Sequence, residues 1–100
     1  MNKVISNWVV KLHHKKAKYL VDLIRPFLSK TAKIMDLGCG SGEVSLRLLE
    51  EGYSVTSVDV VNKVKVGGVR VLVYDGVKLP FKDGEFDKVL LITVLHHVDK

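Results

Sequence analysis

Residues 36–42 read DLGCGSG and place three glycines within five positions, directly after a short apolar run. Glycine lets the backbone adopt positive φ and approach a ligand closely, because it has no β-carbon. A helix that begins after such a turn offers unpaired N–H groups and a partial positive charge. The stretch therefore predicts a loop that holds a nucleotide-like ligand with its backbone.

A carboxylate at the end of a second apolar run extends this pattern. Asp59 closes the alternating residues 53–60 and lies 17 positions beyond Gly42. Its two oxygens can accept hydrogen bonds from a ribose diol, and charged hydrogen bonds of this kind contribute roughly 1.5–3 kcal/mol each. The third glycine comes one residue earlier than in the dinucleotide fingerprint G-x-G-x-x-G. The loop and the acid alone leave a nicotinamide dinucleotide and other nucleoside ligands open.

The elements that must position these residues follow a strand–loop–helix–strand order. This order is typical of a βαβ unit with a parallel sheet, in which ligands bind at the carboxyl ends of the strands. The connection at residues 61–68, VNKVKVGG, is β-branched and ends in two glycines, so we expect little or no helix there. The expected elements are strands at residues 33–37, 53–60, 69–74 and 86–94, and a helix at residues 44–51.

The first third of the chain differs from the rest in period and charge. Apolar side chains of residues 8–27 fall three, four or seven positions apart with lysines between them, which predicts an amphipathic helix with a basic outer face. Residues 1–33 hold eight basic side chains and one acidic one, whereas residues 34–100 hold eight basic and ten acidic ones. The lysines either form a solvated face or contact an anionic partner such as RNA. We therefore divide the chain into a basic amphipathic helical segment at 1–31 and a ligand-binding half-domain at 32–100.

Length and composition set further limits. The chain has 100 residues, 47% of them hydrophobic, which fits one folded domain with a packed core. Its single cysteine, Cys39, excludes an internal disulfide and fits a reducing compartment. We find no apolar run long enough for a signal peptide or a membrane span, so we expect a cytoplasmic protein.

Four ordered segments resemble the class I S-adenosylmethionine-dependent methyltransferases. They are DLGCGSGE, VTSVDV, YDGVKLPFKDGEFD and VLHHV, and the resemblance runs from about residue 32 to residue 99. The closest subgroup is methyltransferase type 11, which is ubiquinone-biosynthesis-like. The resemblance implies an α/β fold, Rossmann-like and doubly wound, with a mainly parallel sheet truncated to about four strands. It also implies S-adenosyl-L-methionine as cofactor and methyl transfer to an unidentified acceptor, a small molecule by the subgroup.

The resemblance also implies which residues bind the cofactor. Asp36 would set the loop around the methionine end, and the glycines would let the backbone approach it. Asp59 would hold the ribose hydroxyls, with Val60 beside the adenine. Asp75 would accept the adenine amino group, and the fourth strand would end beneath the methionine and the sulfonium. The implied set is Asp36, Gly38, Cys39, Gly40, Gly42, Asp59, Val60, Asp75, Gly76, Leu91, Ile92 and Thr93.

Several of these positions also have structural interpretations. Asp36 could cap the loop through local hydrogen bonds, and Asp75 with Gly76 could form a simple turn. His96 and His97 could be a metal pair or a general base, or one could pack while the other caps. We favour packing and capping, because no other cluster of ligands is visible in the sequence. We expect no metal site and name no catalytic residue.

The chain departs from the family in its length. The family sheet has seven strands, and this sequence stops just after the fourth. The fourth strand would then be an open edge, which favours association. We therefore expect a homodimer or pairing with a separate chain through this strand, or a fragment of a longer enzyme. The function hypotheses are a methyltransferase, a non-catalytic cofactor-binding or regulatory module that needs a partner chain, and a nicotinamide dinucleotide binder.

Overall fold

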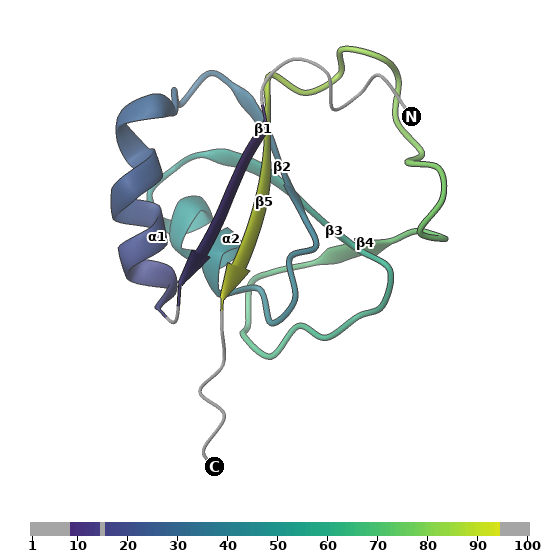
Figure 1. The fold of residues 1–100 in the computed structure, drawn as a ribbon, viewed down its shortest axis with the longest axis horizontal. Coiled ribbons are helices and arrows are strands. Elements are labelled where there is room, and N and C mark those ends of the chain that lie inside the picture. Colours follow the sequence, from purple (N-terminus) through teal and green to yellow (C-terminus); the bar gives the residue numbers. More distant parts are fainter. Residues whose placement is uncertain (1–8, 15, 95–100) are drawn as a thin grey trace.

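The computed structural model describes residues 9–14 and 16–94, with side chains for residues 16–92. Its centre is a five-stranded sheet in the order β1-β5-β2-β3-β4, and each of the four strand pairings is parallel (Figure 1). The strands are β1 (Val9–His14), β2 (Lys33–Leu37), β3 (Ser54–Asp59), β4 (Val71–Val73) and β5 (Lys88–Val94). The helices are α1 (Ala17–Ile24), the short 3₁₀ helix η2 (Arg25–Phe27) and α2 (Glu43–Glu50).

The two α-helices cover one face of the sheet. Helix α1 turns a stripe of apolar side chains inward, and α2 buries Val44 and Leu48 beside it, so both helices follow the helical spacing of their sequences. They pack on Ile34, Leu90 and Ile92 of the central strands. The opposite face is covered by the long connection that precedes β5 (Figure 1). On this face, Leu79 and Phe86 of the connection form a core cluster with Met35, Val58 and Val89 of the sheet.

The predicted βαβ unit is confirmed. The strand predicted at residues 33–37 is β2, the helix predicted at 44–51 is α2, and the strands predicted at 53–60, 69–74 and 86–94 contain β3, β4 and β5. Residues 61–68 form no helix or strand, as their composition predicts. The Rossmann-like, mainly parallel α/β fold is therefore present. Parallel pairing brings the carboxyl ends of all five strands to one edge of the sheet, where the connection from β2 to α2 also lies (Figure 1).

The prediction of one long N-terminal helix is wrong for Val9–His14, which form strand β1. The helix is confined to α1, and Pro26 lies in η2 directly after it. The spacing of apolar residues fits a helix, but a short isolated helix is marginal without packing partners. The free side of β5 offers six register positions to this segment, from Val9 beside Val89 to His14 beside Val94. Strand pairing with β5 therefore outweighs the local helical pattern.

This fifth strand also removes the open edge predicted for the fourth strand of the sequence. β5 lies between β1 and β2, so both of its sides are paired. The expected pairing with another chain assumed that this strand is an open edge of the sheet. That assumption is wrong, because β5 has a neighbour on each side. A homodimer stays a prediction, without that edge as its support.

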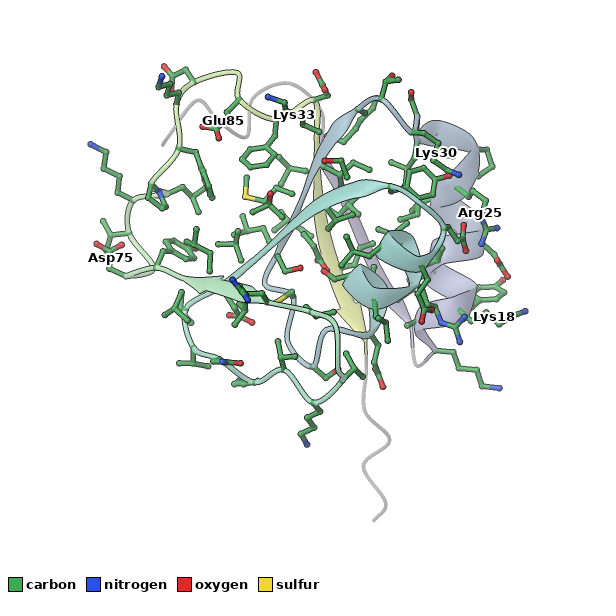
Figure 2. All side chains as sticks on the ribbon, turned by 180° about the vertical axis from the view of Figure 1, so that it is seen from behind. Lys18, Arg25, Lys30, Lys33, Asp75 and Glu85 are labelled. Carbon is green, nitrogen blue, oxygen red and sulfur yellow. The ribbon has the colours of Figure 1, made fainter. Side chains whose placement is uncertain are left out.

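The basic charge of the N-terminal segment is partly neutralised within the fold. Arg25 at the end of α1 donates two hydrogen bonds to Glu51 beyond α2, each 2.8 Å long. Arg25 also lies 2.9 Å from Asp22, which in turn lies 3.7 Å from Lys18. The ammonium of Lys30 lies 4.7 Å from the centre of a tyrosine ring. Figure 2 shows Lys18, Arg25 and Lys30 on the same flank as α1, and of the three Arg25 links the end of α1 to the end of α2.

Candidate functional site

The glycine loop turns over the carboxyl end of β3. Gly38 and Cys39 both donate backbone hydrogen bonds to the carbonyl of Val58, at 2.7 and 3.1 Å. Gly38 and Gly40 have φ of 77° and 56°, which side chains rarely adopt. A β-carbon placed on either glycine would meet no described atom within 4 Å. The bare side of this loop therefore faces open space, as a backbone that contacts a ligand requires.

Asp59, at the end of β3, lies directly against this loop. Its Oδ2 accepts a hydrogen bond from the Gly40 N–H at 2.9 Å, and its Oδ1 accepts one from the Val60 N–H at 2.7 Å. A carboxylate has about four acceptor positions, so each oxygen can accept a further bond. The structure thus brings together the loop and the acid that the sequence predicts to share one ligand.

Asp36 is enclosed beneath the loop in a buried chain of hydroxyls. It lies on β2, beside Ser57 of β3 and Leu90 of β5, and 1% of its surface is exposed. The Ser45 hydroxyl of α2 donates to Asp36 Oδ2 at 2.7 Å, and the Ser57 hydroxyl donates to Ser45 Oγ at 2.6 Å. Asp36 Oδ1 has no hydrogen-bond partner among the described residues. This chain ties β2, α2 and β3 together where the loop begins.

Burial governs the titration of the two ionisable groups at the start of the loop. It raises the pKa of Asp36 from 3.8 to about 6, against the opposing effect of the Ser45 hydrogen bond, and the charge of Asp59 raises it further. Burial also raises the pKa of the Cys39 thiol to about 12, with the charges of Asp36 and Asp59 adding to the effect. Cys39 is therefore a neutral thiol at physiological pH and no nucleophile.

The predicted adenine side lies beyond β3 and β4. Val60 is 46% exposed, and a β-carbon on Gly76 would lie 3.3 Å from its Cγ1, so these two positions are adjacent. Asp75 Oδ1 accepts hydrogen bonds from the Val77 and Lys78 N–H groups at 2.8 and 3.0 Å. These bonds form a local turn and lower the pKa of Asp75. Figure 2 shows Asp75 on the flank opposite α1, and its role toward adenine stays a prediction.

The end of β5 continues past the central strand. Asp36 is the last residue of β2 in register with β5, so Leu91, Ile92 and Thr93 extend beyond it toward the loop edge. Ile92 is buried beneath the helices, whereas Leu91 is half-buried. For Thr93 the structure describes the backbone, opposite His13 of β1. The predicted pair at residues 96 and 97 lies outside the described residues.

Three features of the site were not predicted from the sequence. The first two are Ser45 and Ser57. Each is a polar residue at a position where the helix or strand pattern calls for an apolar one, and this departure could have indicated them. The third is a cavity of about 520 Å³ lined by Gly40, Ser41, Lys63 and Lys65. Its signal was the alternation of lysine and valine in VNKVKV. Within the described part of the chain, no group of three or more His, Cys, Asp or Glu side chains could hold a metal ion.

Replacing Gly42 with alanine should destabilise the fold and disturb the loop. Gly42 has a φ of 91°, and a β-carbon there would lie 3.3 Å from methyl groups of both Val66 and Val69. The left-handed backbone and the crowding together should lower the free energy of unfolding by about 1–3 kcal/mol. Gly67→Ala is the matched control, because a β-carbon there would meet nothing within 4 Å. Chemical denaturation of both variants measures this; equal stabilities would contradict the prediction.

Residues 35–100 match the family model described as a methyltransferase domain. The chain belongs to this family. Among its curated relatives, the putative methyltransferase YqeM of Bacillus subtilis is 32% identical over 77 residues, which cover 68% of this chain and 31% of the relative. Probable tRNA methyltransferase 9B of Bos taurus is 30% identical over 101 residues, covering 86% of this chain and 22% of the relative.

The ubiquinone biosynthesis O-methyltransferase of Rickettsia prowazekii is 23% identical over 116 residues, covering 96% of this chain and 46% of that protein. The chain thus spans from about a fifth to about half the length of these methyltransferases. No solved structure matched the chain significantly. No helix in the described part of the chain has the length and apolar character that a membrane span needs.

Membership of the methyltransferase family makes S-adenosyl-L-methionine the expected cofactor. The geometry fits such a ligand. Gly38 and Gly40 leave space against the backbone, and Asp59 presents a carboxylate to the same space. Val60 adds an exposed apolar side chain next to that carboxylate. A bare loop backbone, a carboxylate and an exposed apolar side chain are therefore contiguous.

Proposed function

We propose that this chain binds S-adenosyl-L-methionine and transfers its methyl group to a small-molecule acceptor. The observation that carries the proposal is the hydrogen bond from Gly40 to Asp59, which joins the glycine loop to the carboxylate at the end of the next strand. In a chain of this family, that contact supports the proposal that the loop and the carboxylate bind one cofactor.

The bound cofactor supplies an electrophilic methyl group on a sulfonium with a neutral leaving group. The protein's part is then to hold and align the reactants and to exclude water. Asp59 would accept the ribose hydroxyls, and the backbone at Gly38 and Gly40 would contact the amino-acid half. A protein base is needed only where the acceptor must lose a proton.

A small-molecule acceptor is supported by the relative named as a ubiquinone biosynthesis O-methyltransferase. The relative named as a probable tRNA methyltransferase supports RNA as a second candidate, together with the basic N-terminal segment. The ion pairs that Lys18 and Arg25 make within the fold favour the small molecule, because fewer cations remain for a phosphate backbone. A cytoplasmic location is part of the same proposal.

Calorimetric titration of the purified chain tests the cofactor first. We expect S-adenosylmethionine to bind with micromolar affinity and NADH not to bind, since the loop spacing and the family both favour the former. Binding of NADH alone would overturn the proposal in favour of a dinucleotide. Methyl transfer by the same chain to a small-molecule extract, compared with tRNA, then separates the two acceptors. Cofactor binding without transfer to either would favour the non-catalytic module.

A further inference from the structure

The connection between β3 and β4 lies across the glycine loop, and we call its residues 61–69 the strap. The Lys65 N–H of the strap donates a hydrogen bond to the Ser41 carbonyl of the loop at 2.9 Å. A β-carbon on Gly42 would lie 3.3–3.5 Å from methyl groups of Val64, Val66 and Val69, so these valines cover Gly42. The strap is therefore seated on the loop by apolar contacts and a backbone hydrogen bond.

Lysine and valine alternate along residues 63–66 of the strap, and the two kinds of side chain face different sides. Val64 and Val66 face Gly42, whereas Lys63 and Lys65 line the cavity of about 520 Å³ together with Gly40 and Ser41. In an extended segment, successive side chains point to opposite sides, so the pattern K-V-K-V places both lysines on one side. The cavity is thus lined by two exposed lysines on one side and by bare loop backbone on the other.

The charges around this cavity are unequally paired. Asp59 and Glu43 contact the same loop, and each already accepts a hydrogen bond from it: Asp59 from the Gly40 N–H and Glu43 from the Ser41 hydroxyl. Within the described part of the chain, neither Lys63 nor Lys65 forms an ion pair. Two cations that line one cavity and form no direct ion pair favour the binding of an anion there.

We propose that Lys63 and Lys65 form an anion-binding wall that takes a carboxylate or phosphate of a ligand lying on Gly40 and Ser41. This inference rests on the proposed function for the identity of the ligand. The anionic group has two possible sources, which are the amino-acid carboxylate of the cofactor and an anionic group of the acceptor.

Paired titrations distinguish the two sources. S-adenosylhomocysteine and 5′-methylthioadenosine share adenine and ribose, but only the former has an amino-acid half. In the double variant Lys63→Gln/Lys65→Gln, we expect affinity for S-adenosylhomocysteine to fall about fivefold to tenfold, with that for 5′-methylthioadenosine unchanged. The matched control is Lys78→Gln/Lys82→Gln, which removes the same charge from exposed lysines outside the strap.

Inorganic phosphate tests the acceptor source, through the shifts that it induces in the Gly40 and Ser41 amide resonances. Phosphate shifts that disappear in the strap variant, with both nucleosides unaffected, would support an anionic acceptor. Two results would contradict the proposed anion-binding role of the lysines. One is an equal loss of affinity for both nucleosides in the strap variant, and the other is no change in either affinity or in the phosphate-induced shifts. If the unaltered chain binds neither nucleoside, the proposed function fails, and the phosphate shifts still decide whether the lysines bind an anion.

Discussion

Replacing Asp59 with alanine should lower the affinity for S-adenosylhomocysteine about a hundredfold or more. The carboxylate would accept two hydrogen bonds from the ribose hydroxyls, at roughly 1.5–3 kcal/mol each. It also accepts the Gly40 N–H, so its loss releases the loop from the end of β3. Both effects act on the same ligand and in the same direction. The measurement is calorimetric titration of the variant and the unaltered chain.

Two comparisons sharpen this experiment. Asp83→Ala removes an exposed carboxylate from a turn outside the site, and it should leave the affinity unchanged. 5′-Methylthioadenosine keeps the ribose, so Asp59→Ala should weaken its binding as well, whereas the loss of the strap lysines should leave it unchanged. A thermal melt confirms that the variant is folded. An affinity within twofold of the unaltered chain would show that Asp59 does not bind the ribose.

Lowering the pH from about 7.5 to about 5 should stabilise the fold through Asp36, by about 1.4 kcal/mol. The pKa of this buried carboxyl is raised from 3.8 to about 6 by its burial. The folded state therefore binds a proton more readily than the unfolded state between these pKa values. Protonation removes the cost of a buried charge, so stability rises as the pH falls through about 6. The full gain, reached below about pH 4, is about 3 kcal/mol.

The variant Asp36→Asn isolates this contribution, because it cannot titrate. Chemical denaturation at several pH values gives the free energy of unfolding as a function of pH. Between about pH 7.5 and 5, this free energy should rise more steeply with falling pH for the unaltered chain than for the variant. The four histidines are common to both proteins, so any contribution from them cancels in the difference. The lowered pKa values of Asp22, Glu51 and Asp75 act below about pH 4.5 and in the opposite direction. Parallel pH profiles would show that Asp36 is already neutral or freely solvated in the fold.

The glycine loop and its acid could be predicted because their signals are local. The order of strand, bare turn, helix and second strand places Gly40 and Asp59 at the same edge of any parallel sheet. The missing helix at residues 61–68 follows equally from β-branched residues and two glycines. What those residues contact could not be predicted in the same way. Only the path of the strap brings Lys63 and Lys65 to the loop.

Asp36, Ser45 and Ser57 show a similar limit. Each is separately visible in the sequence, but their hydrogen bonds join two strands and a helix that meet only in the folded core. The raised pKa of Asp36 comes from this enclosure, because desolvation depends on every element packed around a carboxyl. A role in capping the loop and a role in binding a ligand were both open from the sequence. In the structure the carboxyl accepts a hydrogen bond from Ser45 of α2, and its role toward a ligand stays a prediction.

The sequence by itself determined the parallel βαβ arrangement, the bare glycine loop and the family, because periodicity, glycine spacing and short motifs are properties of a few neighbouring residues. The tertiary structure alone decided the state of Val9–His14. The spacing of their apolar side chains suits a helix. The backbone N–H and C=O groups on the outer side of β5 need partners, and Val9–His14 supply them by pairing as a strand. A segment with weak local preference takes the conformation that satisfies its neighbours in space, and those neighbours lie about eighty residues away along the chain.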